Sequence, residues 1–298
     1  MVVERHKPEA PELNSILQKL ILQRLGFQSQ PAVDLEGLQA VYRAWCTHVP
    51  FDNVRKMIAL RAGPDCLLPG GRAVPFFEGW LADGTGGTCW PTSNTLFELL
   101  RSLGFAACRI TGSMRDLGFV NHASVKVAAD GREWLVDSSL LSNVALPLND
   151  EVFIHDDPVF SAEVGPTTRR MSSGVTRPPN STWLPCRLSR DTATRASYLA
   201  CYDESRARSP FNQRLYARRN RPCEMVVLVG NTRFSKTVEG VVSRDLSTDE
   251  LCEALHRDIG LSEDVIDEWV RAGSIADSFQ PSSGPKPPPV TRKPPSQR

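Results

Sequence analysis

The sequence contains no long apolar run, no strong excess of one charge and no cysteine pair at metal-ligand spacing. No stretch approaches the roughly 18 consecutive apolar residues that a membrane-spanning helix needs. The segment Met1–Pro11 is polar and lacks the apolar core of a secretory signal, so the mature chain is expected to begin near Met1. With a net charge of +1, no global field favours nucleic acid or an anionic membrane. We expect a soluble, cytoplasmic protein that binds neither of them.

Disulfides and a metal site are not expected either. The eight cysteines are scattered through the chain, and none forms a CxxC motif or a Cys/His cluster with zinc-like spacing. Without a signal peptide, most of them should be reduced. Seven are most simply small buried hydrophobes, whereas Cys89 differs from them because it directly follows a glycine-rich turn.

What the sequence has is the composition of a globular protein. Hydrophobic residues make up 41% and charged residues 23% of 298 positions, enough for one large core or for two or three modules. Apolar residues recur at helical spacing over Leu13–Leu25, and a second helix is predicted after Asp34 and before Pro50. A third helix is predicted over Cys89–Leu103, where Gly104 ends it.

Short strands follow these helices. They are predicted at Cys108–Thr111, Ala123–Val127 and Trp134–Val136. Residues 141–190 are rich in Pro, Ser and Thr without a clean period, which predicts loops and irregular strands.

The last third mixes both patterns. A strand pair predicted at Glu224–Leu228 and Thr237–Val242 flanks Gly230-Asn231. The segment Ser247-Thr248-Asp249-Glu250 is a capping box that opens a helix, and a second short helix should follow Ser262. The final residues, 280–298, are mostly Pro, Ser, Lys and Arg and are predicted to be disordered, as an inert tail rather than a Pro-rich ligand.

Cys89 follows the glycine-rich turn Gly84-Thr85-Gly86-Gly87-Thr88 and precedes Pro91, a residue favoured in the first turn of a helix. Its sulfur is therefore expected at a helix N-terminus. There the macrodipole and free backbone N–H groups favour a thiolate and can stabilise an oxyanion on a bound acyl carbonyl. From this turn alone, a buried structural cysteine is an equally good interpretation.

A thiol needs a base to take its proton and form the thiolate, and the register of a predicted hairpin indicates one. If Asp130-Gly131 is a two-residue turn, counting outward places Ser124 opposite Asp137. His122 is two residues from Ser124 and therefore shares the face of Asp137, at a diagonal distance of about 7 to 8 Å between backbones. A carboxylate at that distance can orient an imidazole.

Cys89, His122 and Asp137 thus form a candidate catalytic triad. His122 would draw the thiol proton, and Asp137 would fix its tautomer and stabilise the imidazolium. The alternative is a solvated sheet face, because Lys126 and Glu133 fit the same alternation.

With these residues in place, the sequence resembles the arylamine N-acetyltransferase family, whose members carry a Cys-His-Asp triad in this order. The resemblance covers roughly residues 12–275. The motifs that carry it are His48-Val49-Pro50-Phe51-Asp52-Asn53, Gly86-Gly87-Thr88-Cys89, Asn121-His122, Trp134-Leu135-Val136-Asp137, and Ser209-Pro210-Phe211-Asn212 followed by Leu215, Arg218-Arg219 and Pro222.

The resemblance implies an α+β fold with a cysteine-proteinase-like core. Its parts would be an N-terminal helical bundle with the nucleophile (1–106), a central antiparallel β-barrel with His122 and Asp137 (107–205), a C-terminal α/β lid (206–279) and the tail (280–298). The implied reaction is ping-pong: acetyl-CoA or another acyl-CoA acylates Cys89, CoA leaves, and an arylamine, hydrazine or related amine takes the acyl group. The implied partners are small molecules, without a metal.

Several positions depart from the family pattern. Thr85 replaces the arginine of the Arg-Gly-Gly-x-Cys turn, and Pro91 and Ser93 replace the glutamate and asparagine that usually follow the cysteine. Asp137 is followed by Ser138-Ser139-Leu140 rather than by Val-Gly-Phe-Gly. The triad is kept while its surroundings are altered.

Other candidate residues are weaker. The segment Thr111, Gly112 and Ser113 could present backbone N–H groups of a turn to CoA phosphates, although an ordinary turn is the alternative. Arg218 and Arg219, expected on a helix, could offer charge to phosphates or simply face water. His48 and His155 show no partner and are interpreted as structural.

Three other functions stay open. An amide synthase on this scaffold would take its acyl chain from a carrier protein. A transglutaminase-like amidase or protease is suggested by Gly87-Thr88-Cys89-Trp90 ahead of a helix. A catalytically silent binding protein is suggested by the altered residues near the nucleophile. The sequence does not indicate an oligomeric state.

Overall fold

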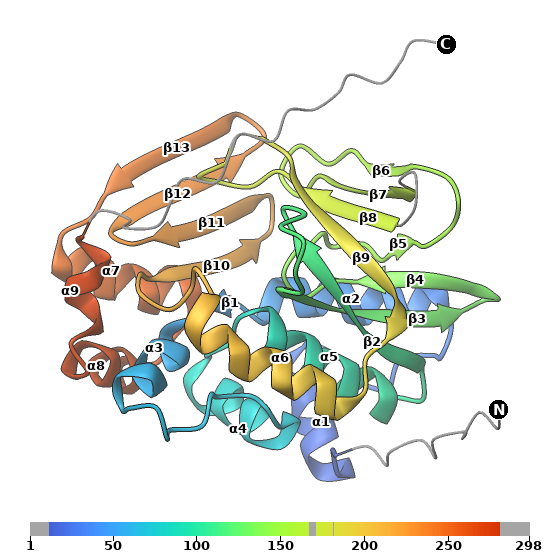
Figure 1. Cartoon of the computed structure of the whole chain (residues 1–298), viewed down its shortest axis with the longest axis horizontal. Helices are drawn as coiled ribbons and strands as arrows, with labels where there is room; N and C mark the ends of the chain where they lie inside the picture. The colour runs from blue at the N-terminus through green and yellow to red at the C-terminus, as the bar shows by residue number, and fades with distance from the viewer. Residues whose placement is uncertain (1–11, 167–170, 181, 281–298) are drawn as a thin grey trace.

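The computed structural model describes residues 12–166, 171–180 and 182–280. The polar segment 1–11 and residues 281–298 of the predicted tail lie outside these ranges. Figure 1 shows N-terminal helices, an eight-stranded sheet on one side and a five-stranded sheet on the other. The predicted α+β fold class is confirmed. In the described part of the chain, no helix is long and apolar enough to cross a membrane.

The N-terminal part is helical. Its elements are α1 (Ser15–Arg24), α2 (Leu35–His48), α3 (Val54–Arg61), α4 (Ala73–Asp83) and α5 (Cys89–Ser102). The side chains of Asn14 and Asp34 cap α1 and α2 by accepting a backbone N–H of the first turn. The predicted apolar stripe of α2 is buried, whereas Ile16 and Leu20 of the stripe predicted for α1 are exposed.

Two of these helices, α3 and α4, were not predicted, because they lie in a stretch of the sequence interrupted by glycine and proline. Most of those residues fall between the two helices, as Gly63-Pro64 and Pro69-Gly70-Gly71 do. Pro75 occupies the first turn of α4, where a missing N–H costs no helical hydrogen bond. These glycine and proline residues indicate where the two short helices end. Because they dominate the local pattern, the sequence did not predict the helices themselves.

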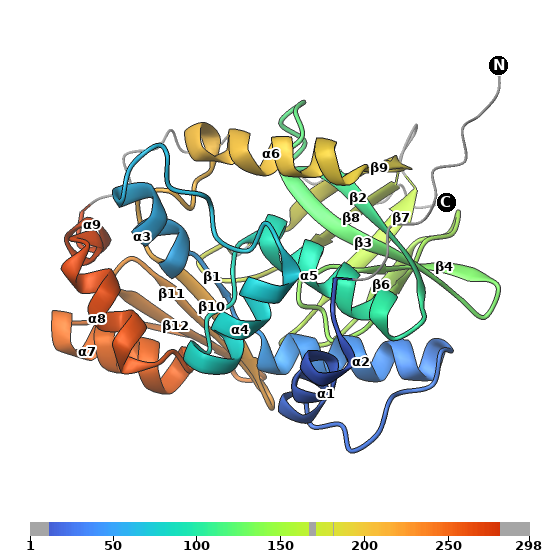
Figure 2. The same cartoon turned by 90° about the horizontal axis from the view of Figure 1, so that it is seen from below.

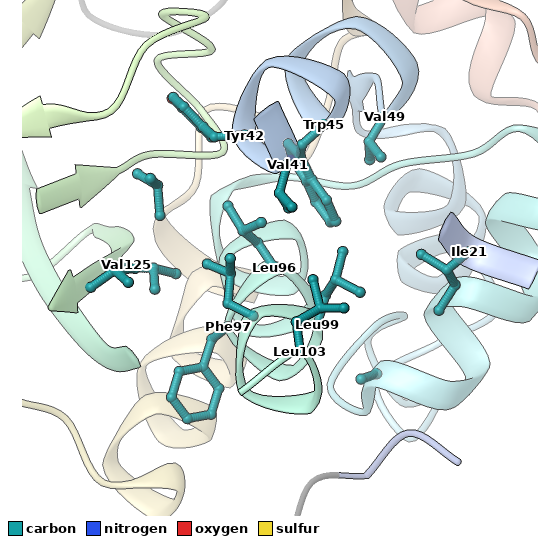
Figure 3. Close-up of a cluster of buried hydrophobic side chains, with 14 of the residues drawn as sticks. Ile21, Val41, Tyr42, Trp45, Val49, Leu96, Phe97, Leu99, Leu103 and Val125 are labelled. Atoms are coloured by element: carbon teal, nitrogen blue, oxygen red, sulfur yellow. The ribbon is translucent and has the colours of Figure 1, made fainter. Parts of the chain in front are cut away.

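Helix α5 lies at the centre of the helical part. Its Leu96 and Leu99 are fully buried. Figure 3 shows them among residues from α1, α2 and the barrel, including Ile21, Trp45 and Val125. A later helix, α6 (Arg195–Arg208), adds Tyr198 and Tyr202 to the same core, and in Figure 2 the helix α5 lies between α6 and α2. This core therefore draws on both sides of the predicted boundary between residues 106 and 107, which stays a prediction.

The second part is an antiparallel sheet that curls into a nearly closed barrel, in the order β5-β4-β3-β2-β9-β8-β7-β6. Its strands are β2 (Ala106–Met114), β3 (His122–Ala129), β4 (Arg132–Val136), β5 (Leu146–Pro147), β6 (Phe153–His155), β7 (Ala162–Pro166), β8 (Met171–Val175) and β9 (Leu184–Thr192). The prediction of loops and irregular strands over 141–190 misses the regular pairing of β7, β8 and β9. Strands β5 to β8, of two to five residues, are too short to show a clear alternation, whereas the nine residues of β9 were missed because they mix polar and apolar side chains without a clean period.

The predicted register of the β3–β4 hairpin is confirmed. Ala129 pairs with Arg132 and Val125 with Val136, so the count outward from the turn is correct. Asp130 has a φ of 49° and Gly131 one of 71°, as a two-residue type I′ turn requires.

The C-terminal part is a sheet in the order β1-β10-β11-β12-β13, flanked by helices. The elements are β1 (Phe51–Asp52), β10 (Tyr216–Arg221), β11 (Glu224–Val229), β12 (Thr232–Thr237), β13 (Gly240–Asp245), α7 (Thr248–Ala254), the π-helical turn η1 (Leu255–Ile259), α8 (Glu263–Arg271) and α9 (Ser274–Ser278). The capping box of Ser247 and the cap of Ser262 are confirmed. The strand predicted at Thr237–Val242 is wrong, because the chain turns there between β12 and β13, and β12 itself pairs with β11.

Strand β1 joins the N-terminal third to this last sheet. Asp52 pairs with Ala217 of β10. The side-chain amide of Asn53 donates to the carbonyl oxygens of Phe211 and Arg214, and its oxygen accepts the N–H of Tyr216. The segment that precedes the nucleophile turn is thus part of the C-terminal sheet.

Replacing Leu96 by Ala tests the central position of α5. The side chain is fully buried, so we expect the free energy of unfolding to fall by about 2–5 kcal/mol. The matched control is Leu67→Ala, at a leucine that is 86% exposed, which should change it by less than about 0.5 kcal/mol. Urea denaturation measures both, and equal effects of the two substitutions would contradict the packing.

Candidate active site

The nucleophile turn is held against β1 at very short range. A Cβ on Gly86 would lie 1.7 Å from the carbonyl oxygen of Pro50, so only glycine fits there. The N–H of Gly86 donates to Oδ2 of Asp52 at 2.7 Å, and the N–H of Asp52 donates to the carbonyl of Gly87 at 3.2 Å. Asp52 also accepts the N–H of Val54 at the start of α3. Its carboxylate thereby fixes the turn and the helix together.

Arg55 on α3 reaches the other end of the same turn. Its Nε donates to Oγ1 of Thr85 at 3.0 Å, and its guanidinium forms an ion pair with Asp83. Thr85 is the residue that stands where the family pattern has an arginine. An arginine therefore does contact this turn, but it comes from α3.

Cys89 is the first residue of α5, as the sequence predicts, and is 6% exposed. Its Sγ lies 3.9 Å from the carbonyl oxygen of Asn121. The next residue, Trp90, is held by Tyr198, whose hydroxyl donates to the Trp90 carbonyl at 2.7 Å. The first N–H groups of a helix have no acceptor within it, so they remain available beside the sulfur.

His122 and Asp137 form the pair that the hairpin register predicts. Nε2 of His122 lies 2.7 Å from Oδ2 of Asp137, and the two residues are 2% and 1% exposed. Burial alone lowers the pKa of His122, but the Asp137 carboxylate outweighs it and holds that pKa well above its ordinary value. Burial raises the pKa of Asp137, yet His122 and two backbone N–H groups bring it below the ordinary value. The pair is thus an imidazolium and a carboxylate.

The surroundings of Asp137 fix its orientation. Its Oδ1 accepts the N–H groups of Ser139 and Leu140 at 2.8 and 2.9 Å. Its carbonyl accepts the hydroxyl of Tyr42 from α2 at 2.7 Å. A solvated sheet face, the alternative considered above, is wrong at this end of the hairpin because His122 and Ser124 are both buried.

Hydroxyl groups link α5 to the strand end that carries Asp137. Oγ of Ser138 lies 2.8 Å from the hydroxyls of both Thr92 and Ser93, and Ser93 also donates to the carbonyl of Ala123. Two positions that depart from the family pattern, Ser93 and Ser138, therefore contact each other. At these two positions, the serine hydroxyls link α5 to the segment that carries Asp137 in place of the residues of the family pattern.

A buried ion pair lies further along α5. Arg109 of β2 is 2.7 Å from Glu98 and donates from Nε to Asn94 at 2.8 Å. Its guanidinium also lies 3.9 Å from the ring centroid of Phe97. These contacts fix α5 to the barrel two to three turns beyond Cys89.

The predicted CoA segment is not a turn. Thr111, Gly112 and Ser113 lie inside β2, between β3 and β9. A Cβ on Gly112 would lie 2.8 Å from Sγ of Cys186, so the glycine serves close packing. The geometry gives no support to phosphate binding by these backbone amides.

The expected helix for Arg218 and Arg219 is also wrong, because both lie on β10. Arg218 is fully buried and donates to the carbonyls of Ser139 and Leu140, next to Asp137. Arg219 donates to the carbonyls of Thr47 and Ile259. Neither simply faces water.

The remaining histidines stand apart from the pair. His48 is half-buried, and burial lowers its pKa, while His155 lies on β6. Among the residues with described positions, no cluster of three or more His, Cys, Asp or Glu residues could hold a metal ion.

Arg55, Tyr42 and Ser138 are supporting residues that sequence reasoning did not identify. One indication was available for Arg55: it stands two residues after the Pro50–Asn53 motif, in a sequence whose turn lacks the expected arginine. Tyr42 and Ser138 carry no comparable sequence pattern, since their contacts depend on how α2 packs on the barrel.

A thiol at a helix N-terminus, beside a buried imidazolium and carboxylate, is an arrangement of cysteine enzymes that transfer acyl groups. Residues 34–156, which contain all three side chains, match a family model described as N-acetyltransferase. No curated protein matches the sequence.

Solved structures extend this match to most of the chain. The arylamine N-acetyltransferase of Mycobacterium marinum aligns with a TM-score of 0.74 at 15% identity, over 88% of this chain and 98% of that chain. That of Nocardia farcinica gives 0.73 at 19% identity, over 90% and 100%. A Bacillus cereus arylamine N-acetyltransferase, described as having a unique Cys-His-Glu catalytic triad, gives 0.69 at 14%, over 84% and 100%.

At these identities the structures establish the shared fold, and the family match adds the class of enzyme. The match of residues 34–156, which is less than half of the chain, and the shared fold support an acetyltransferase-type enzyme similar to the arylamine N-acetyltransferases. The resemblance predicted from the motifs is confirmed.

Replacing Asp137 by Asn tests the buried pair. Removing one partner of such a pair should lower the free energy of unfolding by about 3–5 kcal/mol near pH 6. The raised pKa of His122 makes its contribution present below about 6.5 and lost as pH rises through the raised value. The lowered pKa of Asp137 makes its contribution present above about 3.8 and lost as pH falls through the lowered value.

The difference in stability between wild type and Asp137→Asn should therefore be largest near pH 5–6 and smaller on both sides. Urea unfolding across this range measures it. The control is Asp156→Asn, at an exposed carboxylate, which should follow the wild type. A difference that is the same at every pH would contradict an ionised pair.

Replacing Arg55 by Met tests the support of the turn. The ion pair is partly exposed, so we expect a loss of stability of no more than about 1 kcal/mol. A displaced turn misplaces Sγ, so alkylation of Cys89 by iodoacetamide should slow by roughly tenfold to a hundredfold. The control is Arg61→Met on the same helix, which removes an ion pair with Asp277 and should leave alkylation unchanged. Equal rates in both variants would show that the turn does not need Arg55.

Proposed function

We propose that the chain transfers an acyl group from acyl-CoA, acetyl-CoA in the first instance, to an amine of the arylamine or hydrazine type through a thioester on Cys89. The observation that carries the proposal is the 2.7 Å pair of His122 and Asp137, buried beside a cysteine that opens a helix. A structural cysteine does not need an oriented imidazolium beside it. The acetyltransferase class of the chain supplies the reaction type.

In the first half-reaction, the thiolate of Cys89 attacks the carbonyl carbon of the acyl-CoA. The oxyanion that develops is stabilised by the first N–H groups of α5 and by the positive end of its dipole. The bond between the carbonyl carbon and the CoA sulfur then breaks. His122, which holds the proton of the Cys89 thiol, passes it to the leaving sulfur.

In the second half-reaction, the amine nitrogen attacks the thioester carbonyl. His122 accepts the proton of the nitrogen, the carbon–sulfur bond to Cys89 breaks, and the amide leaves. The thiolate and imidazolium are restored. Since His122 uses Nε2 for Asp137, Nδ1 is the ring nitrogen that exchanges these protons.

The surface beside Cys89 suits an aromatic acceptor. The loop between β2 and β3 presents Leu117, Phe119 and Val120, which are 48%, 40% and 47% exposed. Asn121 follows directly, and its carbonyl oxygen lies 3.9 Å from Sγ of Cys89. Exposed apolar side chains at this place would contact the ring of an arylamine.

Intact mass spectrometry after incubation with acetyl-CoA tests the proposal. We expect one acetyl adduct on the wild type, none on Cys89→Ala, and loss of the adduct when an arylamine is added. Cys252→Ala, which alters a half-buried cysteine on α7, is the control and should still acquire the adduct.

The rival functions give different results in the same experiment. An adduct from a carrier-bound thioester but from no acyl-CoA would indicate an amide synthase. Hydrolysis of a peptide amide through Cys89 would indicate a transglutaminase-like amidase. No adduct from either donor, with Cys89 alkylated no faster than the other cysteines, would indicate a binding protein.

A further inference from the structure

Lys56 is a buried lysine on the side of Cys89 that faces α3. It lies in the first turn of α3, directly after the β1 segment that holds the nucleophile turn, and is 3% exposed. Its Nζ donates to Oγ of Ser205 at 2.9 Å and lies 6.0 Å from the ring centroid of Tyr202, both on α6. In the described part of the chain, no carboxylate lies within 4.0 Å of this ammonium to form an ion pair.

A buried ammonium without a carboxylate is costly. Burial lowers the pKa of Lys56 to about 8, a negative charge on Cys89 would raise it, and the like charge of Arg206 lowers it further. At neutral pH the side chain is still mostly protonated. The carboxylate of Asp52 is nearby but accepts the N–H groups of Gly86 and Val54, so a thiolate on Cys89 is a further anion that can offset the burial of Lys56.

A small cavity connects Lys56 to the nucleophile turn. Its volume is about 20 Å³, enough for a water molecule, and its lining includes Lys56, Asp52, Gly86, Gly87 and Thr88. The hydroxyl of Thr88, the residue before Cys89, is buried and has no hydrogen-bond partner in the described structure. The site is thus polar on the side of the turn that faces α3.

We propose that Lys56 is a second cation, besides the His122 imidazolium, that stabilises the Cys89 thiolate. It is a positioning residue that acts from α3, whereas His122 acts from the barrel. The inference rests on the proposed function, because it takes Cys89 to be a thiolate. It adds to the triad a group that touches neither the substrate nor the reacting atoms.

The charges around Cys89 give the physical reason. The titratable groups that face it or face Lys56 are His122 on β3, Asp137 on β4, Cys186 on β9, Tyr198, Tyr202 and Arg206 on α6, and Asp52 on β1. Burial raises the pKa of Cys186 to about 12 and the pKa of both tyrosines above its ordinary value, so these three groups are neutral near pH 7.

The triad alone then carries one net negative charge in a buried place. The thiolate and the Asp137 carboxylate count two, and the His122 imidazolium compensates one of them. Asp52 and Arg206 add one negative and one positive charge, which cancel in this count, so the ammonium of Lys56 compensates the remaining charge of the triad. Because charges in a buried site are weakly screened, this second compensation acts across the cavity without direct contact.

The pH profile of Cys89 alkylation in Lys56→Met tests the inference. The reagent is iodoacetamide, and peptide mass spectrometry follows Cys89 from pH 5 to 9. We expect the pH of half-maximal alkylation to rise by about one unit. Below that pH the rate should be about tenfold lower than in the wild type.

Two further variants separate charge from packing. Lys56→Arg keeps the cation and should keep the wild-type profile to within about threefold. Lys236→Met removes another buried lysine, on β12, whose electrostatic partners do not include Cys89, and should also leave the profile unchanged. A wild-type profile in Lys56→Met would overturn the inference.

A reciprocal measurement compares two proteins that both keep Lys56. The titration of the Lys56 ε-carbon by ¹³C NMR, assigned with Lys56→Arg, is compared between the wild type and Cys89→Ala. Because coupling between two sites is reciprocal, the Lys56 midpoint should be about one pH unit lower without the thiolate. An unchanged midpoint overturns the inference.

The proposed function of Cys89 and the proposed role of Lys56 are contradicted by different results. If wild-type Cys89 is alkylated no faster than the other cysteines, the nucleophile itself is absent, and the proposed function falls together with the inference. If Cys89 is alkylated fast and forms the acyl adduct, but the pH profile of its alkylation is the same in Lys56→Met as in the wild type, only the proposed role of Lys56 is contradicted.

Discussion

The carboxylate of Asp52 is the interaction on which the geometry of the nucleophile turn depends. It accepts the N–H of Gly86 in the nucleophile turn and the N–H of Val54 at the start of α3, while its own backbone pairs with Ala217 in the C-terminal sheet. Burial raises the pKa of Asp52 to about 6, so its ionised form is held in place against a considerable desolvation cost. The Asp52 side chain thus fixes the turn and the start of α3, while the backbone of the same residue joins both to the last sheet. Asparagine could not accept both N–H groups with equivalent oxygens.

Much of the site could be predicted because it depends on local geometry. The Asp130-Gly131 turn sets the register of its hairpin, and the register places His122 beside Asp137 without reference to the rest of the fold. The helical position of Cys89 follows equally from its flanking glycines and Pro91. What could not be predicted depends on contacts between distant segments. The burial of Arg218 beside Ser139 and the contact of Arg55 with Thr85 appear only when separate elements pack together. Helices α3 and α4 were concealed because their turn residues dominate the local pattern.

The departures from the family pattern turn out to be linked to one another. Thr85 lacks a guanidinium, and Arg55 supplies one to the same turn. Ser93 and Ser138 hydrogen-bond to each other across the junction of helix and barrel. These substitutions keep the mutual positions of nucleophile, base and carboxylate while the chemistry of the supports changes. The proposed role of Lys56 would add a charge to these altered contacts. Lys56 lies on α3, the same helix whose Arg55 contacts the turn at Thr85.

The pairing of β1 with β10 also has a consequence for how the protein comes into being. A ribosome that has completed residues 1–205 has delivered all three members of the triad, but not the strand to which Phe51 and Asp52 pair, nor the carbonyls that hold Asn53. The turn before Cys89 contacts this same segment. Its full set of supporting contacts therefore forms only after residues 211–218 have been made, so the part of the chain that follows the triad completes the scaffold of the nucleophile.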